Sequence, residues 1–116
     1  MKLVVIESPY AGDVERNTQY ARDAMADSLH RGEAPIASHL LYTQPGILDD
    51  LIPGERTLGI EAGLAWGAHA DLVAVYSDLG ASSGMALGIE RALAEGREIE
   101  YRSLPPWADE CNECAW

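Results

Sequence analysis

The chain has 116 residues, a net charge of −11 at pH 7 and a pI near 4.4. A chain of this length forms one domain, which buries roughly two-thirds of its unfolded surface and needs no disulfide or metal for its core. The negative charge excludes duplex nucleic acid as a partner, because proteins bind that phosphate backbone with clustered Lys and Arg. The same charge repels a free nucleotide at long range, so any phosphate site has to be local and built from backbone N–H groups.

No apolar run approaches the roughly 18 residues that a transmembrane helix needs. The first residues, MKLVVIESPY, are too short a stretch for a signal peptide. We therefore expect a cytoplasmic protein without a membrane partner, and we expect no cofactor.

The pattern of apolar and polar residues predicts strands and helices that alternate along the chain. Strands are predicted at residues 2–7, 35–38, 71–77 and 98–102. Helices are predicted at residues 14–30, after an Asp13 cap, at residues 55–66, and from Ser82 or Ser83 to a cap at Gly96. Residues 39–53 are expected to form an irregular loop with at most one helical turn, near residues 46–51. This order predicts an α/β fold, a small Rossmann-like three-layer domain with a parallel sheet of four to five strands.

The turn after the buried strand at residues 71–77 is the strongest candidate for a binding site. Its sequence, from Asp78 to Gly84, is rich in small residues and leads directly into a helix. The first N–H groups of a helix have no partner within it, and the helix dipole adds positive potential there. The pattern therefore predicts a phosphate site, made by Ser82, Ser83, Gly84 and Met85.

Several short motifs occur in a fixed order along the chain. They are S-P-Y-x-G at residues 8–12, Asn17 in the next helix, P-I-A-S-H at residues 35–39, an arginine-bearing helix, and D-L-G-x-S-x-G-M at residues 78–85. Through them, residues 1–104 resemble the nucleoside 2-deoxyribosyltransferase-like family, most closely its short branch that is common in phage genomes. If the protein is encoded by a phage, its compartment would be the host cytoplasm.

The resemblance implies a flavodoxin-like sheet, a homo-oligomer, and a nucleoside or nucleoside monophosphate as the small-molecule ligand. In active relatives a glutamate attacks the anomeric carbon of the sugar and splits the N-glycosidic bond through a covalent glycosyl-enzyme intermediate. In the phosphate-binding members, a Ser and a Gly of the turn before that glutamate hold the 5′-phosphate.

The chain departs from this pattern at the position of the nucleophile. The family's glutamate stands four residues after the turn glycine, where this chain has Gly88, and glycine cannot act as a nucleophile. A glycine inside a helix costs about 1 kcal/mol relative to alanine, so Gly88 suggests that a ligand or another backbone presses close. Glu90 lies roughly 200° further around the helix and is expected to face away. Asp78 is the better carboxylate, and it either caps the turn, orients ribose hydroxyls, or replaces the lost nucleophile or base.

Residues expected to contact the substrate are Pro9, Tyr10, Gly12, Asn17, His39 and Gly88. Structural alternatives stay open for three of them: Tyr10 packs over the first helix, Asn17 bridges to the loop, or His39 caps a loop. Arg56 either lies on a solvated helix face, pairs with Asp49 or Asp50, or reaches a subunit interface.

Residues 105–116 form a separate acidic and aromatic tail that begins with two prolines. Cys111 and Cys114 have the spacing of metal ligands but supply only half of a structural zinc site, which needs four. They are weak metal candidates beside the alternative of an ordinary flexible or docked tail. Trp107 and Trp116 are expected to pack on the domain or on a neighbouring subunit.

Three functions follow from these observations. The chain is an enzyme that hydrolyses or transfers the N-glycosidic bond of a nucleoside monophosphate, or a non-catalytic protein that sequesters a nucleotide, for example in phage counter-defence. The third alternative is a structural or assembly protein with a vestigial pocket. Release of free base identifies the enzyme, and an unchanged co-purifying nucleotide identifies the binding protein.

Overall fold

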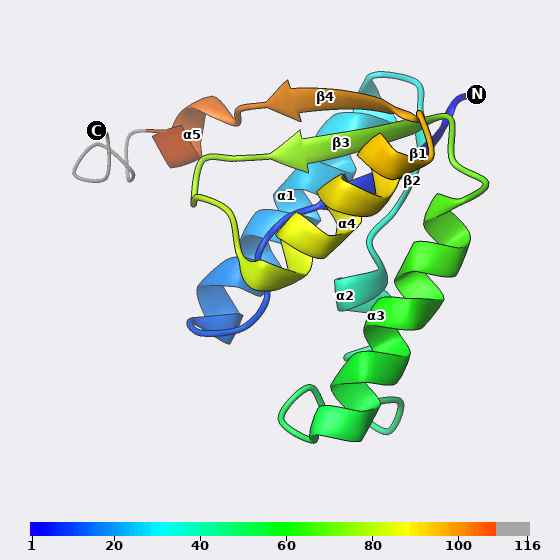
Figure 1. The fold of residues 1–116 in the computed structure, drawn as a ribbon. Coiled ribbons are helices and arrows are strands. Elements are labelled where there is room, and N and C mark those ends of the chain that lie inside the picture. Colours follow the sequence, from blue (N-terminus) through cyan, green and yellow to red (C-terminus); the bar gives the residue numbers. More distant parts are fainter. Residues whose placement is uncertain (109–116) are drawn as a thin grey trace.

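Four parallel strands form the centre of the structure, a computed structural model in which residues 1–108 are described (Figure 1). The strands are β1 (Leu3–Glu7), β2 (Ala34–Ile36), β3 (Leu72–Tyr76) and β4 (Glu98–Arg102), in the order β2-β1-β3-β4 across the sheet. The helices are α1 (Val14–His30), α2 (Ser38–Leu41), α3 (Pro53–Gly67), α4 (Ser83–Ala94) and α5 (Pro105–Ala108). The predicted α/β fold with a parallel sheet is therefore confirmed.

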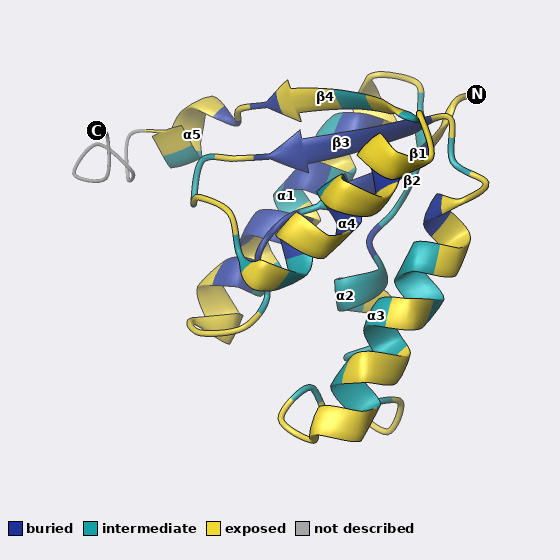
Figure 2. Ribbon diagram, in the orientation of Figure 1, coloured by how far each residue is buried: buried dark blue, intermediate teal, exposed yellow. Residues whose placement is uncertain are grey.

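The core lies on both faces of the two central strands, and β3 is buried along its whole length (Figure 2). Side chains alternate between the faces of a strand. One set, with Tyr76, packs against Tyr20 and Ala24 of α1, and the other set, Val73 and Val75, packs against α4. The two helices thus cover opposite faces of the sheet, which explains why β3 is a continuous apolar run.

The third helix, α3, packs against α2 and α4 and extends beyond the sheet (Figure 1). Its glycines let neighbours approach: a Cβ at Gly63 would lie 3.0 Å from Cβ of Ser38 in α2, and one at Gly59 would lie 3.2 Å from Leu48. The close approach brings α2 and α3 to the same edge of the sheet as the start of α4.

The predicted helical turn near residues 46–51 is wrong, and the turn forms instead as α2 (Ser38–Leu41). Ala37 starts it, because its carbonyl accepts hydrogen bonds from the N–H groups of Leu40 and Leu41. Gly46 has a φ of +84°, which breaks any helix over the predicted segment. The second strand also ends at Ile36 rather than Ser38.

Residues 105–108 of the predicted tail form α5, which docks on α1. The ring of Trp107 meets that of Tyr20 edge to face at 5.1 Å, and its indole N–H donates to Asp23 at 2.8 Å. Trp107 thus packs on the domain, one of the two predicted alternatives. Cys111, Cys114 and Trp116 lie outside the described residues.

Among the helices of residues 1–108, none combines the length and the apolar character that crossing a membrane requires.

Candidate functional site

A cavity opens at the carboxyl edge of the sheet, where β1 and β3 lie side by side. The chain leaves β1 toward β2 on one side, whereas β3 lies on the other, so this is the point where ligands bind in open parallel sheets. The end of β1, α2, α3 and the first two turns of α4 line the cavity. The lining includes Glu7, Ser8, Tyr10, His39, Tyr42, Asp50, Glu55, Arg56, Ser82, Ser83, Gly84, Met85 and Gly88.

Glu7, the last residue of β1, brings a carboxyl group into this cavity. Within residues 1–108 its carboxyl oxygens form neither a hydrogen bond nor an ion pair with another side chain. Burial raises the pKa of Glu7 to about 8, although the positive charge of Arg97 opposes the rise. Glu7 is therefore mostly protonated at pH 7 and can take up or lose its proton near neutral pH.

Gly88 lies directly opposite Glu7, on the buried side of α4. A Cβ added at Gly88 would lie 2.7 Å from Cδ of Glu7, a separation that real side chains do not adopt. The space that a side chain at position 88 would fill is thus occupied by the Glu7 carboxyl. The sequence suggested that a ligand or another backbone presses on Gly88. In the structure the group in contact is instead a side chain from β1, that of Glu7.

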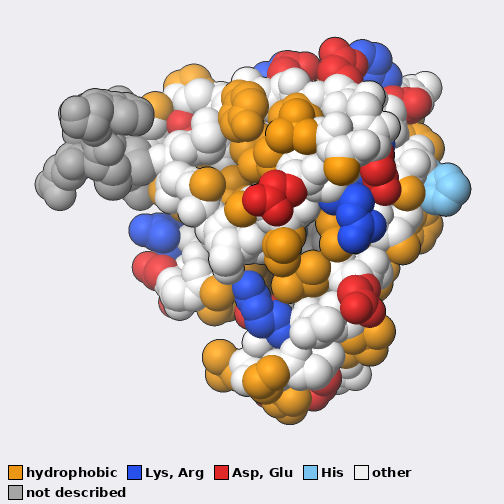
Figure 3. Space-filling view, in the orientation of Figure 1, with side chains coloured by type: hydrophobic (Ala, Val, Ile, Leu, Met, Phe, Trp, Pro, Cys, Tyr) orange, Lys and Arg blue, Asp and Glu red, His pale blue; other side chains and the backbone are white. Residues whose placement is uncertain are grey.

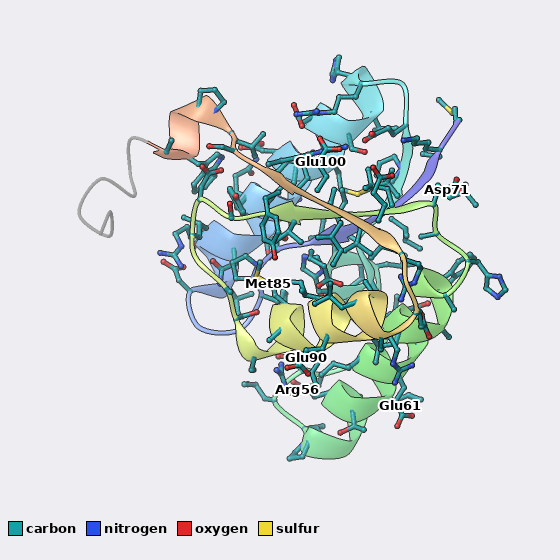
Figure 4. All side chains as sticks on the ribbon, turned by 45° about the horizontal axis from the view of Figure 1, so that its top comes forward. Arg56, Glu61, Asp71, Met85, Glu90 and Glu100 are labelled. Atoms are coloured by element: carbon teal, nitrogen blue, oxygen red, sulfur yellow. The ribbon has the colours of Figure 1, made fainter. Side chains whose placement is uncertain are left out.

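The N-terminus of α4 forms another wall of the cavity. Ser82 is the N-cap, and its hydroxyl accepts a hydrogen bond from the N–H of Met85 at 3.3 Å. The N–H groups of Ser83 and Gly84, at the first two positions of the helix, have no acceptor among the described residues and remain free for an anion. Met85 contributes less than predicted, because its N–H serves the cap and its side chain packs on the sheet (Figure 4).

Arg56 of α3 adds a positive charge beside this helix terminus. Its guanidinium donates to both carboxylate oxygens of Asp50, at 3.1 and 3.2 Å, and to the hydroxyl of Ser83 at 3.5 Å. Figure 4 shows Arg56 at the end of α3 that lies near the start of α4. Of the alternatives for Arg56, the structure shows the pairing with Asp50, which holds Arg56 against the same serine that offers its N–H.

His39 and Ser8 meet at the cavity wall, with 2.7 Å between Nε2 of His39 and the hydroxyl of Ser8. Burial lowers the pKa of His39 to about 4, so the ring is neutral at pH 7. Tyr10 and Tyr42 line the same cavity, and the hydroxyl of Tyr42 accepts a hydrogen bond from the indole N–H of Trp66. The cavity therefore combines aromatic surfaces with a neutral histidine.

Asp78 does not line the cavity. Its carboxylate accepts hydrogen bonds from the Tyr20 hydroxyl at 2.8 Å, the Leu104 N–H at 2.7 Å and the Ser103 hydroxyl. These bonds join the end of β3 to α1 and to the segment that follows β4. The geometry matches the structural alternative of the sequence analysis, in which this aspartate holds the turn.

The remaining predicted contacts lie around the cavity rather than in it. Asn17 is buried, and its amide donates to the carbonyls of Tyr10 and Ala11 at 3.0 and 3.1 Å, so it shapes the loop after β1. Pro9 is buried in that loop, and Gly12 lines a neighbouring groove. Of the predicted substrate contacts, the structure brings Tyr10, His39 and Gly88 together in the cavity.

Among the cavity residues that were not predicted as site residues, Glu7 and Arg56 carry the charges most relevant to a ligand. The available signal for Glu7 was indirect, because it is an acid at the end of a buried strand, opposite a helix with an unexplained glycine. No group of three or more His, Cys, Asp or Glu side chains within residues 1–108 is placed to hold a metal ion.

A family model described as a domain of unknown function, DUF7768, matches residues 2–102. The chain belongs to the DUF7768 family. No curated protein sequence matches it.

The fold of this DUF7768 chain is similar to that of several solved structures. A 2-deoxyribosyltransferase from Bacillus psychrosaccharolyticus has a TM-score of 0.67 at 15% identity, over 87% of this chain and 72% of that protein. A 2-deoxyribosyltransferase from Leishmania mexicana has a TM-score of 0.57 at 16% identity, over 89% and 65% of the two chains. A CMP N-glycosidase from Clostridium botulinum has a TM-score of 0.56 at 13% identity, over 97% and 98%. The chain therefore shares the fold of these proteins.

Proposed function

We propose that the chain binds a nucleoside 5′-monophosphate and cleaves its N-glycosidic bond by hydrolysis or by transfer. One observation carries this proposal: a single cavity holds an anion-binding end, at the start of α4, and a desolvated carboxyl, Glu7, beside Gly88. Gly88 is four residues after Gly84, a rise of about 6 Å along the helix. The ribose of a nucleotide spans a comparable distance between its 5′-phosphate and C1′.

The phosphate is placed at the N–H groups of Ser83 and Gly84, with Arg56 as its counter-charge. A local site of this kind is what a chain of net charge −11 requires, because the long-range field repels the ligand. Bonds from N–H groups to an anion contribute about 1.5–3 kcal/mol each, and the helix dipole adds about 0.3–1 kcal/mol.

We propose that the base packs against Tyr10 and Tyr42, which line the same cavity and offer ring surface. The neutral His39 lies beside Ser8, and both line the cavity that the base would enter. Two proteins of similar fold, a 2-deoxyribosyltransferase and a CMP N-glycosidase, act on compounds of this class, which is consistent with a nucleotide here.

The test is to incubate purified protein with the common ribo- and deoxyribonucleoside 5′-monophosphates and to measure free base by chromatography. We expect base to be released from at least one nucleotide. A second arm adds free acceptor bases, so that transfer gives a new nucleotide while hydrolysis gives the sugar phosphate. Tight binding with no free base would instead favour the nucleotide-sequestering alternative, and neither binding nor release would favour a structural role.

A further inference from the structure

We propose that Glu7 is the catalytic carboxyl of this site, so that the reactive group enters from the end of β1 and not from α4. This inference rests on the proposed N-glycosidic function and names the residue that performs it. Its basis is a complementary pair: Glu7 reaches across to α4, and Gly88 leaves the space that the carboxyl occupies.

The pair explains a glycine that the helix itself does not favour. Glycine is unfavourable in a helix interior, and Gly88 is buried in the middle of α4 with an ordinary helical backbone. Its missing side chain leaves room for the carboxyl, since a Cβ there would lie 2.7 Å from Cδ of Glu7 and would push the Glu7 carboxyl out of its present position. The backbone of α4 is thus adapted to a carboxyl delivered from the sheet.

The bonding of the other carboxyl groups in the cavity singles out Glu7. Asp50 is held by Arg56, and Glu55 accepts the N–H of Asp49 at 3.0 Å. Glu7 has no such partner among residues 1–108, and it is half-buried in the cavity wall. A carboxyl group that only stabilises a fold is paired or hydrogen-bonded, whereas an unpaired one in a cleft indicates a functional group.

The position of Glu7 fits attack on C1′ of a nucleotide whose phosphate sits at Ser83 and Gly84. In the first step a carboxylate oxygen of Glu7 bonds to C1′ while the C1′–N bond breaks. The electron pair of that bond goes to the base, which takes a proton from water. In the second step the oxygen of a water molecule bonds to C1′, the ester bond to Glu7 breaks and returns its electron pair to the carboxylate, and the proton passes to solvent.

Partial desolvation supports this role, because a carboxylate with fewer water contacts is a stronger nucleophile than one fully exposed to water. The raised pKa of Glu7 means that only a part of the protein carries the reactive carboxylate at neutral pH. The positive charge of Arg97, the residue before β4, acts on the carboxyl, and the neutral His39 on α2 lines the same cavity.

The experiment compares base release by the full-length protein, by Glu7→Gln and by the double exchange Glu7→Ala with Gly88→Glu. Glu7→Gln keeps the shape of the side chain, and we expect it to bind the nucleotide in calorimetry but to release base at least 100-fold more slowly. The double exchange returns the carboxyl to the helix, and we expect it to release base at least tenfold faster than Glu7→Gln does. Glu90→Gln, which removes an exposed carboxylate of the same helix, is the matched control with unchanged release.

A second measurement does not depend on how the variants fold. A 2′-fluoroarabinosyl nucleotide withdraws electrons from C1′ and slows release of the covalent sugar, so the wild-type peptide that contains Glu7 should gain the mass of the sugar phosphate. A label on another residue, or full turnover by a folded Glu7→Gln protein, would overturn the role of Glu7 but leave the proposed function standing. Wild-type protein that releases no base from any nucleotide would overturn the proposed function together with it.

Discussion

Glu7→Gln should make the free energy of unfolding less dependent on pH, because the substitution removes a desolvated carboxyl. In the unfolded chain the pKa of Glu7 has its ordinary value of 4.5, and in the folded protein burial raises it to about 8. Below pH 4.5 both states carry the proton, so the group has no effect. Between pH 4.5 and 8 the folded protein retains a proton that the unfolded chain has lost, and stability falls as the pH rises.

The size of the effect follows from the two pKa values. Each pH unit in this window lowers the free energy of unfolding by about 1.4 kcal/mol. From pH 5 to pH 8 the loss for wild type relative to Glu7→Gln is about 3–4 kcal/mol, since the slope levels off near each pKa. The opposite contribution of His39, whose pKa is lowered to about 4, is present in both proteins and cancels.

The assay is urea unfolding of wild type, Glu7→Gln and the exposed control Glu90→Gln at pH 5 and pH 8. The difference between wild type and Glu7→Gln should widen by about 3–4 kcal/mol toward pH 8, with Glu7→Gln the more stable. Glu90→Gln should track wild type at both pH values. An equal difference at the two pH values would show that the Glu7 carboxyl is solvated, and the account of the cavity would fail.

Four further predictions concern the same protein. Gly84→Asp should abolish nucleotide binding in calorimetry, whereas Gly84→Ala, whose Cβ meets nothing closer than 3.9 Å, should bind as wild type does; equal loss in both would refute the charge argument. Base release should rise about tenfold from pH 7 to pH 9 as Glu7 ionises, and a falling profile would instead make Glu7 a proton donor. Asp78→Asn should cost about 1–3 kcal/mol in urea unfolding, and a folded variant without turnover would return Asp78 to a catalytic role. Leu58 and Trp66 are exposed on α3, so light scattering should find a homo-oligomer that Leu58→Glu dissociates, and a wild-type monomer would contradict this.

The strands and long helices could be predicted from the sequence because each depends on local pattern. The apolar run of β3 indicates a strand covered on both faces, and Asp13 caps α1 as its position suggests, accepting the N–H of Arg16. The short helix α2 was missed because it depends on where β2 ends, and strand ends are set by pairing with β1 rather than by the residues themselves.

The cavity was predicted less completely, since it depends on contacts between distant segments. The start of α4 could be found from its small residues, yet the partner of Gly88 lies 81 positions away, at Glu7. A glutamate at a strand end has nothing local to distinguish it from a solvated residue. Asp78 was considered as a catalytic residue because the sequence does not reveal its structural role. That role depends on hydrogen bonds from Tyr20 and Leu104, which lie in distant parts of the chain.

The tight contact between Glu7 and Gly88 also constrains how such a site can change over generations. In this conformation a side chain at position 88 and the carboxyl of Glu7 would occupy the same space. A chain that gained an acid at position 88 while keeping Glu7 would have to turn the Glu7 side chain away from the helix. Searches that demand an acid on the helix will miss chains of this kind, and scoring positions 7 and 88 jointly would find them.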